Sequence, residues 1–258
     1  MRLFLVIDET HFYQPNFVAE LIKKTEHEVV GAVLVTKVLP KSDIERYIIR
    51  NFYYLKISEL FRLGVKKLIL SFKNHFYKSN IYNDFYSVRK VYDHYGIDYF
   101  EVEYDINKKE YINKIKNKNP DIIISSNSLI FSNKILKIPK YCINRHSSLL
   151  PSYGGLWPVF QAVRKKGNKV GVSVHTMEKR IDKGILLAQT VIPIHEKDSV
   201  DILYKKCFAH SAEIVFSAIK RIEENDLETL CNDYKSSYYS FPKKEHWRQF
   251  RKRKIRFI

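Results

Sequence analysis

An asparagine and a histidine stand two residues apart near the middle of the chain, directly after a short apolar run. The run is residues 141–143, which we predict to be a buried strand, and the pair is Asn144 and His146. Strand side chains alternate between two faces, so the amide and the imidazole point the same way. Together they could hold one small polar group, because both can donate and accept hydrogen bonds. Taken alone, the pair could equally cap the edge of a sheet.

A carboxylate that could act on His146 lies further along the chain, in a polar loop. Residues 170–177 and 185–194 are predicted to be two strands of a hairpin, and Asp182 lies in the connection between them. An aspartate beside a histidine orients the imidazole and favours its protonated form. The plain alternative makes Asp182 a turn residue. His175, on the first of these strands, is interpreted as a hydrogen-bonded histidine on a half-buried strand.

Strand and helix patterns alternate along the chain and must position these groups. We predict strands at residues 2–8, 28–36, 67–71, 97–102 and 120–125, and helices at residues 17–24, 44–63, 85–95 and 200–224. Such alternation predicts an α/β fold with an open, mostly parallel, Rossmann-like sheet and helices on both faces. Ligands of these sheets bind at the carboxyl ends of the strands. The loop after residue 125 and the loop that starts at Asn144 should meet there.

The sequence argues against several other kinds of site. Neither G-x-G-x-x-G nor G-x-x-x-x-G-K-[ST] is present, and the first strand runs into Asp8 with no glycine for close approach of a phosphate. Cys142, Cys207 and Cys231 are far apart and lack metal-ligand spacing, so we expect no metal and no disulfide framework. With no signal peptide and no membrane span, a cytoplasmic location is expected.

The bulk composition suits one large α/β domain, or one domain with a small appendage, in 258 residues. The formal net charge of +17 comes mostly from lysine. It fits attraction of polyanionic ligands such as nucleotides, folates or nucleic acid, and it fits a biased genome composition equally well.

The motifs taken together resemble the folate-dependent formyltransferase family, which includes glycinamide ribonucleotide transformylase, methionyl-tRNA formyltransferase and the nucleotide-sugar N-formyltransferases. The resemblance covers roughly residues 120–195, and 38 residues separate Asn144 from Asp182, a spacing similar to the family's. The matching residues are Asn144, His146, Ser148, Leu149, Leu150, Pro151, Tyr153, Gly155, Gly171, Ser173, Val174, His175, Ile181, Asp182 and Gly184.

The resemblance implies transfer of a formyl group from N10-formyltetrahydrofolate to an amine, without a metal. Asn144 would donate its side-chain N–H to the formyl oxygen, and His146 would be a second donor, best when protonated. Asp182 would hold His146 and help to move the proton. Cys142 shares their face but lies deeper in the strand, so we interpret it as a core residue.

The resemblance also implies where the two substrates bind. Backbone groups that read the pterin are expected at Ser128, Leu129, Ile130, Glu178, Lys179, Arg180, Ile181 and Asp182. Contacts to the acceptor are expected at Tyr153, Gly154, Gly155, Trp157 and His75. Tyr153 or Trp157 could stack on a base or sugar, in a loop that departs from the arginine-glycine form of many relatives. His75, Tyr77 and Lys78, after the predicted strand at residues 67–71, could approach a phosphate.

The C-terminal residues 226–258 are expected to form a short basic, aromatic extension of a catalytic domain at residues 1–225. Its basic run could bind nucleic acid or an anionic membrane, or form an amphipathic helix packed through Trp247 and Phe250. It is too short for the barrel typical of methionyl-tRNA formyltransferases. We therefore expect the acceptor to be a nucleotide-linked amino sugar. Glycinamide ribonucleotide or methionyl-tRNA, and a non-catalytic nucleic-acid-binding protein, are the alternatives. A homodimer through the C-terminal region is also possible.

Overall fold

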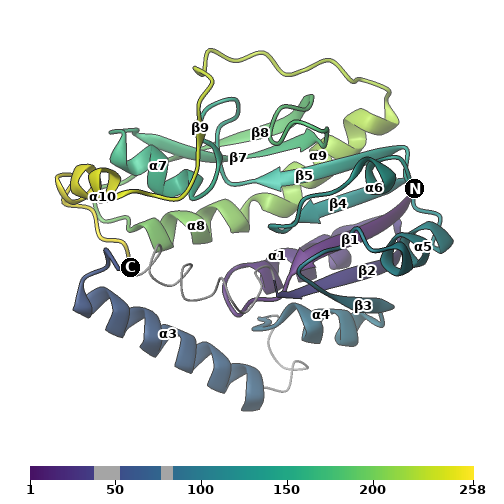
Figure 1. Cartoon of the computed structure of the whole chain (residues 1–258), viewed down its shortest axis with the longest axis horizontal. Helices are drawn as coiled ribbons and strands as arrows, with labels where there is room; N and C mark the ends of the chain where they lie inside the picture. The colour runs from purple at the N-terminus through teal and green to yellow at the C-terminus, as the bar shows by residue number, and fades with distance from the viewer. Residues whose placement is uncertain (38–52, 77–83) are drawn as a thin grey trace.

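A seven-stranded sheet forms the centre of the computed structural model, which describes residues 1–37, 53–76 and 84–258 (Figure 1). The strands are, in sheet order, β3 (Tyr99–Glu103), β2 (Glu28–Lys37), β1 (Arg2–Asp8), β4 (Ile122–Ser126), β5 (Tyr141–His146), β7 (Lys169–Thr176) and β8 (Leu186–Pro193). The first five are parallel, whereas β7 and β8 run antiparallel to their neighbours. The predicted open, mostly parallel sheet is confirmed.

Helices cover both faces of this sheet. The helices of the described residues are α1 (Gln14–Lys24), α3 (Ile57–Phe76), α4 (Val88–Tyr95), α5 (Lys109–Asn117), α6 (Asn133–Leu136), α7 (Pro158–Arg164), α8 (Val200–Ala209), α9 (Ser211–Glu223) and α10 (Lys244–Arg251). Of these, α3 lies apart from the sheet and α10 packs on α7 (Figure 1). Leu3 and Leu5 of β1 belong to one apolar cluster with α1, α4 and α9, while Phe4 and Val6 join another with α5 and α6. Strands buried on both sides need continuous apolar residues, which explains the sequence of β1.

The predicted strand at residues 67–71 is wrong, because these residues lie inside α3. A short apolar run is compatible with a strand or with a helix, and the length of the surrounding segment and its flanking residues distinguish the two. No proline interrupts residues 57–76, so the helix continues through the run. Of the predicted helix at residues 44–63, residues 44–52 lie outside the described chain, and the helix begins at Ile57.

The predicted helix at residues 200–224 is two helices that meet at His210. Ser211, the first residue of α9, donates its hydroxyl proton to the Cys207 carbonyl at 2.8 Å and accepts a hydrogen bond from Arg145 Nε at 2.7 Å. The side chain at the junction is thus tied both to the preceding helix and to β5.

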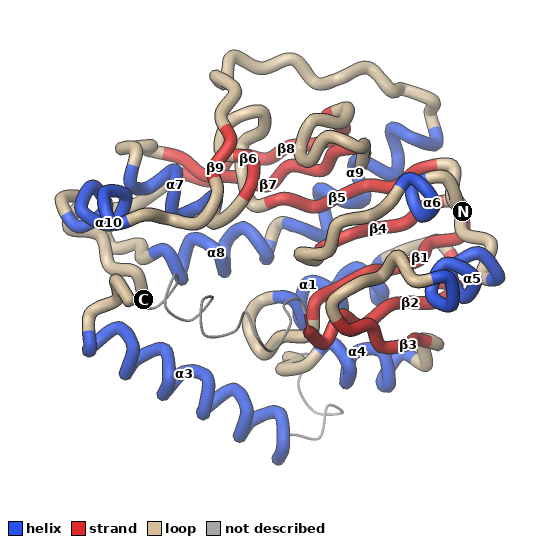
Figure 2. The backbone as a smooth tube through the Cα atoms, in the orientation of Figure 1, coloured by secondary structure: helices blue, strands red, loops and turns tan. Residues whose placement is uncertain are grey.

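The residues after 225 fold back onto the sheet end. Strands β6 (Gly154–Gly155) and β9 (Tyr238–Tyr239) form a small parallel ladder (Figure 2). Trp247 and Phe250 of α10 are buried against Phe160 of α7, with ring centroids 4.7 and 4.9 Å from its own. Packing within the chain therefore accounts for the aromatic residues of the tail.

Candidate active site

Asn144 and His146 are the last alternate residues of β5, at the carboxyl edge of the parallel sheet. Asn144 lies beside Ser125 of β4 on one side and beside His175 of β7 on the other. His146 lies beside Ser173. Because paired residues of neighbouring strands share a face, Asn144, His146 and His175 are brought to one surface.

Asp182 reaches the same surface from the connection between β7 and β8. Its backbone is left-handed, with φ of 54°. Gly184 fixes the return of the loop, because a Cβ there would lie 1.8 Å from the Thr176 carbonyl oxygen. Asp182 Oδ2 accepts a hydrogen bond of 2.7 Å from the Gly155 amide. The carboxylate is thus held by the loop's own shape and by a second loop.

The carboxylate lies between two imidazoles. Asp182 Oδ1 is 3.5 Å from His175 Nε2, and Oδ2 is 3.9 Å from His146 Nε2. Asn144 Nδ2 is 3.3 Å from His175 Nε2. His175 Nδ1 lies 2.7 Å from the Thr176 carbonyl, which can only accept, so Nδ1 carries a proton. His175 is thus hydrogen-bonded, as its interpretation from the sequence has it, and its Nε2 also lies between Asn144 and Asp182.

Burial and charge set the protonation of this cluster. Burial opposes ionisation of Asp182, but the His175 hydrogen bond, the nearby His146 and the Gly155 amide together hold the pKa of this carboxyl well below its usual range. Burial lowers the pKa of His146 and outweighs the opposing effect of Asp182. The site thus combines an ionised aspartate with a His146 whose lowered pKa favours the neutral imidazole at neutral pH.

The loop from Ser147 to Gly155 is shaped by its neighbours. The Leu150–Pro151 peptide is cis, and Leu150 N donates to Ser173 Oγ at 3.1 Å. Gly155 has φ of 87°, and a Cβ there would lie 2.2 Å from the Tyr239 carbonyl oxygen. Only glycine fits so close to β9, so the C-terminal residues determine where the Gly155 amide points.

The residues predicted to contact the acceptor lie in different environments. Tyr153 is half-buried and stacks on Tyr239, and its carbonyl is 3.5 Å from His146 Nε2. The ring of Trp157 stacks on Phe257, so it is already engaged in packing. His75 is exposed near the end of α3 and is not brought to the cluster. Tyr77 and Lys78 lie outside the described residues.

A cavity of about 190 Å³ opens beside Asn144 and His146 at the ends of β1, β4 and β5. Asp8 lines this cavity. In the sequence, Asp8 is notable only because no glycine follows the first strand there. Burial raises the pKa of Asp8 to about 6, although Ser128 Oγ donates to its carboxylate at 3.0 Å. The remaining lining residues are Gln14, Ser126, Asn127, Ser128, Arg145, Ser147, Pro158, Tyr204 and Phe208.

The two loops expected to bind the pterin differ in whether their backbone groups already form hydrogen bonds within the protein. The Leu129 N–H already donates to Asn127 Oδ1 at 2.7 Å, whereas Ile130 is exposed. The other loop, Glu178, Lys179, Arg180 and Ile181, is exposed, and its backbone forms no hydrogen bond within the described chain.

Neither a metal nor a thiol nucleophile is apparent at this site. Across residues 1–37, 53–76 and 84–258, no three histidine, cysteine or acidic side chains are grouped to hold a metal ion. Burial raises the pKa of Cys142 to about 12, so its thiol stays protonated in the core.

Comparison with known proteins found similar sequences. A family model described as "Formyl transferase" matches residues 65–219. The bifunctional polymyxin resistance protein ArnA of Wigglesworthia glossinidia brevipalpis is 35% identical over 190 residues, 72% of this chain and 29% of that protein. Methionyl-tRNA formyltransferase of Thermotoga neapolitana is 31% identical over 161 residues, 61% of this chain and 51% of that enzyme. The chain thus spans about half, or less, of these relatives.

Two solved structures share the fold. A phosphoribosylglycinamide formyltransferase from Anaplasma phagocytophilum aligns with a TM-score of 0.60 and 16% identity, covering 92% of this chain and 97% of that one. A sugar N-formyltransferase from Shewanella sp. FDAARGOS_354 aligns with a TM-score of 0.56 and 16% identity, covering 93% and 76%.

Proposed function

The chain belongs to the formyl transferase family, and from this premise we propose that it transfers a formyl group from N10-formyltetrahydrofolate to an amine. The observation that carries the proposal is the cluster of Asn144, His146, His175 and Asp182 at the carboxyl edge of the sheet. Its donors and its buried carboxylate match the needs of acyl transfer to nitrogen.

In the proposed reaction a neutral amine attacks the formyl carbon, and the formyl oxygen becomes negative. Asn144 Nδ2 and the Nε2–H of His146 donate to that oxygen. His146 is neutral beforehand and takes up the proton released by the attacking amine, because the developing negative charge and Asp182 stabilise the imidazolium. The imidazolium then gives this proton to N10 of the folate. The new C–N bond remains, the bond to N10 of the folate breaks, N10 gains a proton and the former amine loses one.

His175 acts in this proposal as a positioning residue. Its Nδ1 is fixed by the Thr176 carbonyl, so its Nε2 stays between Asn144 and Asp182. The amide of Asn144 is then oriented before substrate arrives, which lowers the reorganisation needed in the transition state.

For the folate we propose the exposed backbone of residues 178–181 and the loop at Ser128, Leu129 and Ile130. The first loop is supported by its free backbone groups, and it leads directly into Asp182. A pterin bound there would place its formyl group beside the carboxylate. The second loop borders the cavity through Ser128.

We propose a nucleotide-linked amino sugar as the acceptor. Asp8 lines the cavity at the end of β1, and a carboxylate there disfavours a phosphate close to that strand end. A sugar hydroxyl or amine suits such a wall, because both can donate to a carboxylate. In this view residues 1–225 form the catalytic domain, and residues 226–258 support the loop at Gly154 and Gly155.

The test is incubation with N10-formyltetrahydrofolate and a panel of amines, with mass spectrometry of the products. The panel contains UDP- and dTDP-linked amino sugars, glycinamide ribonucleotide and methionyl-tRNA. Formylation of an amino sugar alone supports the proposal. Formylation of glycinamide ribonucleotide or methionyl-tRNA instead would refute the acceptor. Salt-sensitive RNA binding with no formylation of any amine would refute the reaction.

A further inference from the structure

One side of α3 presents large apolar side chains to solvent. Phe61 is 72% exposed, Leu68 71%, Phe72 63% and Phe76 66%. The first three follow the spacing of one helical face, with Val65 between them. The three phenylalanines alone expose about 400 Å² if a fully exposed ring side chain presents ~200 Å². The largest apolar patch of a whole monomer is usually about 300–600 Å², so a single helix here reaches that size.

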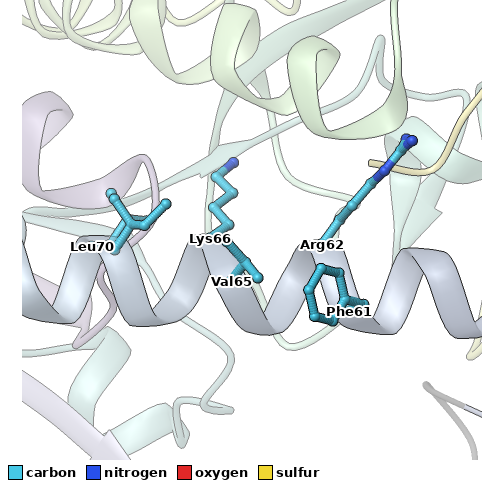
Figure 3. Close-up of a pocket in the computed structure, with 6 residues that line it drawn as sticks. Phe61, Arg62, Val65, Lys66 and Leu70 are labelled. Atoms are coloured by element: carbon cyan, nitrogen blue, oxygen red, sulfur yellow. The ribbon is translucent and has the colours of Figure 1, made fainter.

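The opposite side of α3 holds the helix to the protein through charged groups. Glu59 pairs with Arg251 at 2.5 Å, and Lys66 pairs with Asp201 of α8 at 2.6 Å. Figure 3 shows Lys66 extending from α3 towards the rest of the molecule, whereas the Phe61 ring lies against the helix itself. Glu59 and Lys66 are two turns apart, so the polar contacts form one line. The helix is therefore amphipathic with its apolar side outward.

The basic C-terminal run lies beside the start of this helix. Arg251 not only pairs with Glu59 but also donates to the Tyr54 carbonyl at 3.1 Å. The run continues through Lys252 and Lys254, which are exposed and form no ion pair within the described chain. Figure 1 shows the C-terminus next to the first turn of α3. The first turn of the apolar helix and two lysines with no ion pair in the described chain thus lie near each other.

Lys67 adds an exposed cation on α3 itself, and it has no ion pair with any residue in the described part of the chain. We propose that the outward face of α3, with Lys67 and the adjacent basic tail, binds the surface of an anionic lipid bilayer. The helix would lie in the interfacial plane with Phe61, Leu68 and Phe72 among the acyl chains. Exposed apolar side chains and nearby lysines are the two features that such binding needs.

Charge selects this occupant over a second copy of the chain. Each copy carries a formal +17, so pairing two copies would bring like charges together. An anionic surface is instead attracted, over a range of about 8 Å at physiological salt. Among the described residues, no helix is long and apolar enough to cross a membrane, which agrees with a helix lying on its surface.

Flotation with vesicles tests the proposal without any substrate, so its failure is separate from failure of the proposed reaction. The two vesicle types are phosphatidylcholine alone and an equimolar mixture with phosphatidylglycerol. We expect binding to the mixed vesicles, weakened by salt, and little binding to phosphatidylcholine alone. Absence of binding to the mixed vesicles would overturn the proposal.

The apolar contribution is tested by the triple variant Phe61→Ser, Leu68→Ser and Phe72→Ser. We expect it to lose vesicle binding while its melting temperature stays near that of the parent. The matched control is Val191→Ser with Leu230→Ser, two partly exposed apolar residues on other elements, which should bind as the parent does. Equal binding by the triple variant overturns the proposal. A large fall in the melting temperature of the triple variant, with no loss of vesicle binding, would also overturn the proposal. The apolar face of α3 would then be covered by other residues of the chain.

The electrostatic contribution is tested by Lys67→Gln, Lys252→Gln and Lys254→Gln together. At about 1 kcal/mol per lysine near an anionic surface, binding to mixed vesicles should fall on the order of 100-fold. The control removes three exposed lysines at the other end of the molecule and should change binding far less; these are Lys109, Lys116 and Lys134.

Light scattering of the parent protein and of the apolar variant separates lipid from a second copy. We expect both proteins to be monomeric at the concentrations used for flotation. A parent dimer that dissociates in the apolar variant, together with absent vesicle binding, would assign the face to self-association.

Discussion

Replacement of Asp182 by asparagine should remove the charge of the site while keeping its shape. Asparagine tolerates the left-handed backbone at this position, and its carbonyl oxygen can still accept the Gly155 amide. What disappears is the negative charge 3.9 Å from His146 Nε2. At an effective dielectric constant of about 20, that charge stabilises an imidazolium by about 4 kcal/mol. We therefore expect kcat to fall roughly 10³-fold.

The pKa of His146 gives a readout that a purely structural role would not move. Asp182 raises this pKa against the effect of burial, so the asparagine variant should titrate at lower pH than the parent. An NMR titration of the imidazole measures the change. Formyl transfer is followed by the release of tetrahydrofolate with the acceptor identified in the amine panel.

Asp198→Asn is the matched control for this experiment. Asp198 is also buried, pairs with Lys206 at 2.7 Å and accepts a loop amide from His195. Its substitution should lower stability and leave kcat within about twofold. If Asp182→Asn kept the parental kcat, or if the two aspartate variants lost kcat equally, the assigned role of Asp182 would be refuted.

Three further predictions concern residues around the site. Asp8→Asn should stabilise the protein relative to the parent as pH rises through about 6, by at most ~3 kcal/mol. The raised pKa of the Asp8 carboxyl stabilises the parent below the unfolded pKa of 3.8, and this stabilisation is lost as pH rises. Urea unfolding of both proteins at pH 5 and pH 8 measures the difference, and an equal result at the two pH values would contradict a raised pKa of Asp8. Gly155→Ala should cost about 3 kcal/mol or more, because its Cβ would lie 2.2 Å from the Tyr239 carbonyl; an unchanged melting temperature would contradict the described path of β9. Arg145→Met should leave the free energy of unfolding unchanged or raise it by up to about 2 kcal/mol, because the buried Nη2 has no hydrogen-bond partner among the described residues and Ser211 keeps its bond to Cys207. A fall in the free energy of unfolding, measured with urea, would show that the bond to Ser211 and the stacking of the guanidinium on Phe208, 3.8 Å from the ring centroid, outweigh the cost of the buried charge.

Much of the site could be predicted from local sequence patterns. The position of Asn144 and His146 at the end of a strand follows from the apolar run before them. Alternation then places both side chains on one face. The alternating order of strands and helices likewise predicted the sheet, because burial on both sides demands the continuous apolar runs of β1 and β4. These properties depend on residues a few positions apart, which the sequence displays directly.

The errors occurred where several structures fit the same local pattern. The apolar residues 67–71 suit a strand, yet the proline-free stretch around them and the contacts of Glu59 and Lys66 stabilise a helix. The pattern also failed to say which side of that helix meets the protein. Charged partners on α8 and α10 decide this, and they lie far away in the chain.

The chemical groups of the site, and the strand faces that carry them, follow from the order of the residues alone. Which distant groups meet depends on how the strands and loops pack. The register of β5 against β7 places His175 between Asn144 and Asp182, and the pairing of β6 with β9 makes Gly155 necessary. The physical reason is that side-chain periodicity is a local property. Register and docking, in contrast, follow from the packing of segments separated by tens of residues, whose contacts no local pattern records.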